Sequence, residues 1–131
     1  AHRDVGQCAF GPAHEGKRLF RQIDGAAKAF DAAIAAKEGS LTPAQTTALN
    51  GKLRDIEQTL LSPSGLPFRP WFRNILYAPG RFTGYGSKTL PGLREAVEER
   101  RFDDATREAG IAAKALGDYA DRLNEAAGLL K

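Results

Sequence analysis

The sequence has very little of the chemistry that a catalytic site needs. Its 131 residues include one cysteine and two histidines, Cys8, His2 and His14, all near the N-terminus. A single cysteine excludes a disulfide within the chain and a cysteine-based metal cage. A hydrolytic zinc centre needs ligands from several elements, and a Ser/His or Cys/His pair needs a histidine in the folded body. We therefore expect no catalytic residue, metal site or cofactor in this chain.

Long apolar runs are also missing. No stretch approaches the length of a membrane-spanning helix, and the N-terminus lacks the apolar core of a signal peptide. The net charge of +3 falls short of the basic footprint of a nucleic-acid-binding protein. We expect no membrane segment in this chain and no nucleic-acid partner. The length and the 42% hydrophobic content fit a single globular domain.

Helical periodicity begins at Lys17. Residues 1–16 show no period, and we interpret them as an irregular leader or the remnant of an upstream segment. From Lys17 onward, apolar residues recur at three- and four-residue steps, which predicts a helix that Gly39 ends. The residues of this apolar face are Leu19, Phe20, Ile23, Ala27, Phe30 and Ile34.

Two further helices have recognisable start signals. Thr42 and Gln45 have the spacing of a capping box, so a second helix follows them and ends before Pro63. Pro91 is a favourable first-turn residue, and the third helix that it begins places Val97 inward. The mixed charges that follow, from Glu95 to Arg101, are typical of a solvated helix face.

The last helix has the most regular pattern. Asp103 and Asp104 precede it, which predicts an aspartate N-cap. Its apolar residues alternate four and three positions apart, the spacing with which one helix packs along another. The candidates for this seam, within the bundle or across a dimer, are Leu116, Tyr119, Leu123 and Leu130. Together the pattern predicts an all-α fold, an antiparallel four-helix bundle with a long ordered loop between helices 2 and 3.

The crossing between the second and third helices, residues 62–90, holds most of the aromatic residues. Flexible linkers lack aromatics, so we expect these side chains to be buried or used. No acidic residue lies between Glu57 and Glu95. The basic residues of that stretch are Arg69, Arg73, Arg81, Lys88 and Arg94. Such a loop could bind a carboxylate or phosphate; alternatively, its arginines pair with helix carboxylates and its aromatics pin it to the bundle.

Two segments carry a resemblance to a known family. GLPFRPWFRNILYAP at residues 65–79 and GYGSKTLPGL at residues 84–93 resemble the dimerisation domain of transferrin receptors and glutamate-carboxypeptidase-like metallopeptidases. The resemblance implies a helical domain over residues 17–131 that follows a zinc-peptidase-like domain and pairs with its twin in a homodimer. It also implies that zinc belongs to that catalytic domain, which is missing here, so this chain is no enzyme by itself.

The resemblance further implies a substrate loop. In the glutamate carboxypeptidase branch, the loop after Tyr-Ala-Pro closes over the active site, and a Lys-Tyr pair in it holds the substrate's terminal glutamate. Tyr85 stands at the tyrosine position, but Gly84 stands at the lysine position, which leaves the substrate open. Arg81 and Lys88 are candidates to supply the charge for a peptide substrate with an acidic end.

Three functions therefore stand side by side. The first is the homodimerisation and substrate-loop domain of a glutamate-carboxypeptidase-like zinc peptidase. The second is a non-enzymatic receptor-like assembly domain, which metal ligands in the upstream sequence would exclude. The third, a free-standing anion-binding bundle, rests only on the cationic crossing and predicts salt-sensitive binding to heparin. The family is often extracytoplasmic, but the sequence itself indicates no compartment.

Overall fold

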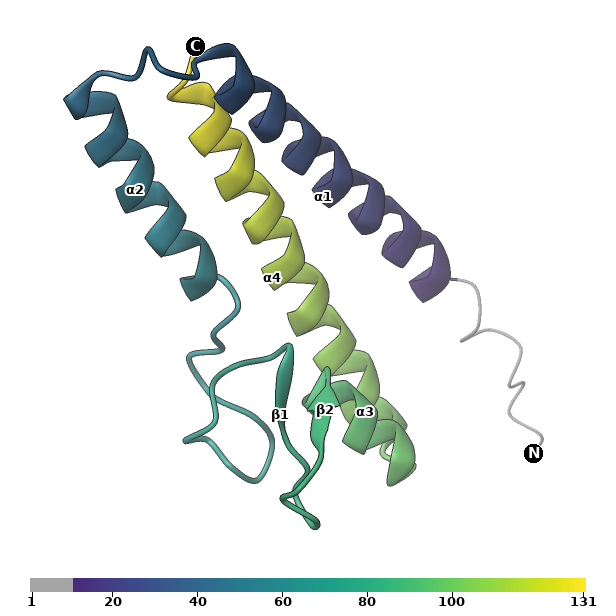
Figure 1. Ribbon diagram of the computed structural model, residues 1–131. Coiled ribbons are helices and arrows are strands. Elements are labelled where there is room, and N and C mark those ends of the chain that lie inside the picture. Colours follow the sequence, from purple (N-terminus) through teal and green to yellow (C-terminus); the bar gives the residue numbers. More distant parts are fainter. Residues whose placement is uncertain (1–10) are drawn as a thin grey trace.

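The computed structural model describes residues 11–131, which form four helices and one small sheet (Figure 1). The helices are α1 (Gly11–Ala36), α2 (Pro43–Gln58), α3 (Pro91–Glu98) and α4 (Phe102–Gly128). The strands β1 (Tyr77–Pro79) and β2 (Ser87–Thr89) pair antiparallel within the crossing. The fold is thus mainly helical, as predicted, whereas the two short strands were not predicted.

Helix α4 is the central element and lies between α1 and α2 (Figure 1). One core cluster joins Ala26 of α1 and Ile56 of α2 to Ala120 of α4. A second cluster lies further along α4, where Leu49 of α2 meets Ala126 beside later residues of α1. Residue numbers therefore rise together along α1 and α4 and fall along α2. Helix α1 runs parallel to α4, and α2 runs antiparallel to both.

The prediction of a wholly antiparallel bundle is wrong for α1 and α4. The reason is the length of α3, which has eight residues, while α1 has 26 and α4 has 27. Since a helix rises about 1.5 Å per residue, α3 is too short to return the chain along the bundle. The chain therefore enters α4 at the end where α2 stops, and α4 itself spans the full length (Figure 1).

The helix starts agree with the sequence in part. The capping box of α2 is confirmed, because the Gln45 N–H donates to Thr42 Oγ1 at 3.2 Å and the Thr42 N–H donates to Gln45 Oε1 at 3.1 Å. Helix α1 begins at Gly11 and so includes the last part of the predicted irregular leader. Residues 1–10, with His2 and Cys8, lie outside the described residues, and the domain boundary at residue 17 stays a prediction.

Two local predictions are wrong. Helix α4 begins at Phe102 with Arg101 as its N-cap, and Asp103 and Asp104 occupy its first turn instead of capping it. Val97 was expected to face inward but is 50% exposed.

No helix within residues 11–131 has the length and apolar character required to cross a membrane.

Candidate functional site

The crossing between α2 and α3 is an ordered part of the fold. The Ser62 N–H donates to the Arg73 carbonyl at 2.8 Å, and the Ile75 N–H donates to the Leu60 carbonyl at 3.0 Å. Further along, β1 and β2 form a hairpin in which Ala78 lies opposite Lys88. These backbone bonds build one end of the molecule, below the long helices in Figure 1. We call residues 77–89 the hairpin.

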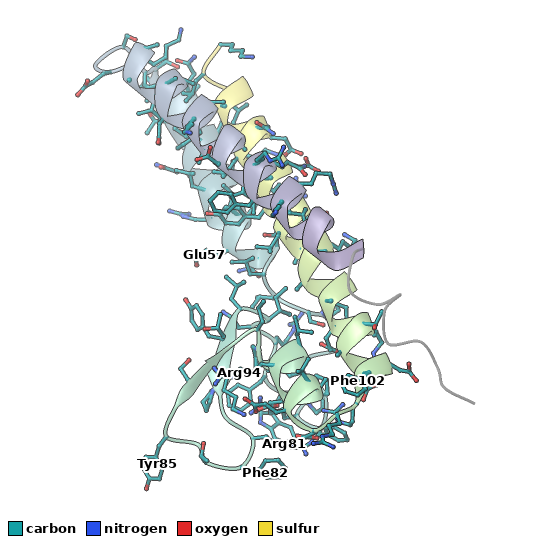
Figure 2. The ribbon with its side chains drawn as sticks, turned by 90° about the vertical axis from the view of Figure 1, so that its right-hand side faces the viewer. Glu57, Arg81, Phe82, Tyr85, Arg94 and Phe102 are labelled. Carbon is teal, nitrogen blue, oxygen red and sulfur yellow. The ribbon has the colours of Figure 1, made fainter. Side chains whose placement is uncertain are left out.

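The aromatic side chains of the crossing are exposed. Their exposed fractions range from 36% to 103%, so they do not pin the crossing to the bundle. Figure 2 shows Tyr85 and Phe82 at the outer edge of this end, away from the long helices. The residues concerned are Phe68, Trp71, Phe72, Tyr77, Phe82 and Tyr85. These exposed side chains are candidates for contact with a partner.

Three cations of the crossing pair with carboxylates at α3, which agrees with the ion-pair part of the alternative that the sequence left open. Each pair joins the crossing to α3 or to its C-cap: Arg69 with Glu95 at 2.9 Å, Arg81 with Glu99 at 3.0 Å, and Lys88 with Glu98. The crossing therefore does not present a free cationic surface at these three positions. The charged run from Glu95 onward, predicted to be a solvated face, instead contacts the crossing.

Glu95 is the centre of this arrangement and is buried, with 5% of its surface exposed. Its carboxylate accepts hydrogen bonds from Arg69 Nη2 at 2.9 and 3.0 Å and from the backbone N–H of Arg81 at 2.9 Å. Arg69, 4% exposed, also donates from Nη1 to the Pro79 carbonyl. Lys88 Nζ lies 4.0 Å from Glu95 Oε1. One buried carboxylate thus connects the crossing, the hairpin and α3.

The structure does not bring the three predicted substrate residues together. The Arg81 guanidinium lies between the rings of Phe68 and Phe82, at 4.3 and 4.4 Å from their centroids, and pairs with Glu99. Lys88 extends from β2 to Glu98. Tyr85 alone lies fully exposed, in the loop that joins the two strands. Of the three, Tyr85 is free to contact a ligand without first breaking an ion pair.

The cations next to Glu98 keep its carboxylate ionised. Hydrogen bonds from Lys88 and then from Arg94 hold the pKa of the Glu98 carboxyl below its usual range. Glu98 therefore stays anionic as the pH falls toward the usual glutamate pKa. The negative charge of Glu98 therefore continues to balance the positive charge of Lys88 over the same pH interval.

A metal does not fit these carboxylates. Among residues 16–131, whose side chains the structure describes, no group of three or more His, Cys, Asp or Glu could hold a metal ion. A zinc site needs ligands that are not already engaged, and Glu95, Glu98 and Glu99 each bind arginine or lysine.

An apolar groove lies on another part of the surface, between α1, α3 and α4. Leu19, Leu90, Leu93 and Leu116 line it together with small residues of α4. Phe20, which follows Leu19 in α1, is 73% exposed, although its spacing predicted a core position.

The predicted seam residues divide between this groove and the core. Leu123 and Leu130 lie in the two core clusters, and Tyr119 packs against the first of them. Leu116 lines the groove.

Sequence reasoning missed Glu95, but a signal existed. A crossing with several arginines and no acidic residue needs carboxylates from elsewhere in the chain, and Glu95, Glu98 and Glu99 share one helix face.

Comparison with known proteins gives a family match and several relatives that match part of the chain. The model of the transferrin receptor-like dimerisation domain matches residues 14–124. A probable glutamate carboxypeptidase of Arabidopsis thaliana is 36% identical over 53 residues, covering 40% of this chain and 8% of the relative. A probable glutamate carboxypeptidase of Arthroderma benhamiae is 44% identical over 50 residues, 38% of this chain and 7% of the relative.

The third relative has a different name. Vacuolar protein sorting-associated protein 70 of Saccharomyces cerevisiae is 36% identical over 50 residues, covering 38% of this chain and 6% of the relative. The matched part therefore spans less than a tenth of the length of these curated relatives.

Proposed function

This chain belongs to the transferrin receptor-like dimerisation domain family, and from that premise we propose that it is the homodimerising domain of a glutamate-carboxypeptidase-like protein. The observation that carries the proposal is the family match across residues 14–124. The peptidase side is supported by two relatives named as probable glutamate carboxypeptidases. In this proposal the chain is not catalytic by itself, and zinc-dependent chemistry belongs to a catalytic domain elsewhere in a longer protein.

The groove between α1, α3 and α4 is the proposed dimer face. Its leucines present apolar surface that pairing would remove from water. Ala109, Gly110 and Ala113 of α4 also line it, and such small residues allow a partner helix to approach closely. Phe20 stands exposed on the adjoining helix. In a two-fold dimer the same face is used by both copies, so each apolar contact counts twice.

The exposed aromatic end is proposed to face the peptidase domain of the same protein. Its aromatic side chains offer a large apolar area to a partner, and aromatic residues are enriched in interface cores. Tyr85 lies fully exposed at the outer edge of this end, and its hydroxyl can donate to an anionic oxygen of a peptide with an acidic end. Arg81 and Lys88 are already paired with Glu99 and Glu98, whereas Tyr85 is fully exposed, so Tyr85 is the leading substrate residue.

The dimer face is tested by two matched substitutions. Phe20→Asp and Phe82→Asp make the same chemical change at positions that are 73% and 78% exposed, so neither disturbs the core. We expect Phe20→Asp to weaken the dimer by about thirtyfold or more, the size of a hot-spot loss. Phe82→Asp should leave the dimer dissociation constant unchanged. Sedimentation equilibrium measures both, and an unaltered constant for Phe20→Asp would place the dimer contact elsewhere.

The substrate loop has its own test in the longer parent protein. Tyr85→Phe removes one hydroxyl at the hairpin tip, and Tyr77→Phe removes one from an exposed tyrosine in β1. Steady-state hydrolysis of a dipeptide with a C-terminal glutamate is the assay. We expect Tyr85→Phe to raise KM several-fold and Tyr77→Phe to leave it unchanged. Equal kinetics for both variants would exclude Tyr85 from substrate binding, and no hydrolysis by the unaltered protein would favour the receptor-like alternative.

A further inference from the structure

We propose that Arg69 and Glu95 are positioning residues that fix the base of the hairpin and thereby the direction in which Tyr85 is presented. The inference rests on the proposed function for what Tyr85 contacts. The fixing of the hairpin itself rests only on contacts within this chain.

The two side chains hold the backbone on both sides of Gly80. Arg69 Nη1 donates to the carbonyl of Pro79, the last residue of β1. Glu95 Oε1 accepts from the N–H of Arg81 at 2.9 Å. The position where β1 ends and the loop begins is therefore bound by one donor and one acceptor. Because these contacts involve backbone atoms, they depend on Arg69 and Glu95 and not on the side chains of the hairpin.

Arg69 and Glu95 also fix each other. Both Glu95 oxygens accept from Arg69 Nη2, at 2.9 and 3.0 Å, and each residue is at least 95% buried. Burying such a pair costs desolvation energy, and Arg69 Nε has no hydrogen-bond partner among the described residues. A buried ion pair is thus weak evidence for stability. What it supplies here is geometry, because both members also bind the hairpin backbone.

The rest of the hairpin is held less tightly toward its tip. The Gly80 N–H donates to the Gly86 carbonyl at 3.0 Å, and the Gly84 N–H donates to the Gly80 carbonyl at 3.1 Å, so the loop closes on its own base. Lys88 in β2 binds Glu98 of α3. Tyr85 lies beyond these contacts, fully exposed and far from the helices (Figure 2). A shift at the base is therefore carried to Tyr85.

A loosened base predicts a specific kinetic change. Tyr85 would sample many orientations, and a substrate would have to select the productive one. That cost falls on substrate capture, so KM would rise more than kcat would fall. A residue needed only for folding would instead lower the amount of active protein.

The test replaces the ion pair with apolar side chains of similar volume. Exchanging a buried ion pair for apolar residues often keeps or raises stability, so Arg69→Met with Glu95→Leu should fold. We expect the amides of Arg81 and Gly84 to exchange with solvent about tenfold or more faster, while amides of α4 keep their rates. The control is Glu98→Gln, which loses exposed ion pairs of the same helix and should leave the Arg81 amide unchanged. Exchange rates are measured by NMR.

A second variant, with a smaller change, tests the same role if the double variant does not fold. Glu95→Gln keeps an acceptor for Arg81 but loses the charge that pairs with Arg69, so we expect several-fold faster exchange at Arg81 and Gly84. Wild-type exchange rates in either folded variant would overturn the positioning role. The dimer mass is measured on the same samples: a monomeric unaltered chain would overturn the proposed function, while the exchange result would still decide the inference.

Discussion

Single backbone positions determine the shape of the crossing. Gly65 has a φ of +71°, and a Cβ placed there would lie 2.1 Å from the Pro70 carbonyl oxygen. Phe68 has a φ of +63°, in the left-handed region that large side chains rarely adopt. Its ring nevertheless lies outward, with the guanidinium groups of Arg81 and Arg101 at 4.3 and 5.0 Å. The tight turn around these residues is what brings Arg69 inward and Phe68 outward.

Gly65 is the glycine that the crossing can least replace. We expect Gly65→Ala to destabilise the chain by more than about 3 kcal/mol, because its Cβ would overlap backbone atoms as well as sit at positive φ. Gly84→Ala is the matched control. Gly84 has a φ of +68° but open space around the added Cβ, so only about 1–2 kcal/mol of backbone strain is expected. Urea denaturation of both variants measures the difference, and equal losses would contradict this geometry.

Glu108 makes stability depend on pH in an unusual direction. Its carboxylate is buried beside Gly92, with Arg107 Nε 3.7 Å away and Asp104 and Arg101 nearby. Burial raises the pKa of Glu108 above its usual value, so the folded chain favours the protonated form. Its contribution to stability is present below the usual pKa and is lost as the pH rises through the folded pKa.

Glu108→Gln should therefore stabilise the chain at neutral pH relative to the unaltered protein, and this gain should shrink toward acidic pH. Glu125→Gln is the contrast. Lys52 and then Arg122 lower the pKa of Glu125, so its contribution is present at neutral pH and is lost as the pH falls. Melting temperatures of Glu108→Gln and Glu125→Gln, measured from acidic to neutral pH, distinguish the two behaviours. A Glu108→Gln gain that is the same at every pH would contradict a raised pKa.

At the scale of elements, α3 controls more than its eight residues suggest. Its carboxylates bind the crossing, and its shortness makes α4 run parallel to α1. Gly92 allows α3 to lie against Glu108 of α4, since any Cβ there would meet the Glu108 carboxylate at 2.4 Å. Helix α3 therefore connects the hairpin to the long helices.

Helix α2 offers a test of the capping box. Thr42→Ala removes the acceptor for the Gln45 N–H, and we expect a loss of about 1 kcal/mol in the free energy of unfolding. Thr47→Ala makes the same change inside α2, where alanine is the better helix former, and should cost nothing. Chemical denaturation followed by circular dichroism compares them. Equal effects would show that the cap contributes no stability.

Local signals were enough to predict the helices but not their arrangement. Capping by Thr42, the restart at Pro91 and the apolar period of α4 depend on neighbours in sequence, and the structure contains the three helices they predict. The burial of Glu95 and the exposure of Val97 depend on which face of α3 the crossing covers, and no local pattern encodes that. The parallel course of α1 and α4 likewise follows from α3 being short.

The candidate site was likewise predictable from the sequence only in part. The position of Tyr85 in the loop after Tyr-Ala-Pro was expected from a resemblance between sequences, but its full exposure was not. Arg81 and Lys88 were selected for their charge, and their pairing with Glu99 and Glu98 arises from contacts across the fold. Charge counted along a segment does not reveal which carboxylates lie opposite it in space.

For the whole molecule, the two proposed functions use different surfaces. The groove lined by Leu19, Leu93 and Leu116 lies along the helices, and the aromatic end lies around the hairpin. A second copy and a peptidase domain could therefore bind at the same time.

The most direct test of the central claim is the solution mass of the unaltered chain, measured by light scattering coupled to size exclusion over a wide concentration range. We predict a mass of twice the monomer that falls toward one monomer only at high dilution. A monomer at every concentration would contradict the proposal that this chain dimerises through its own surface.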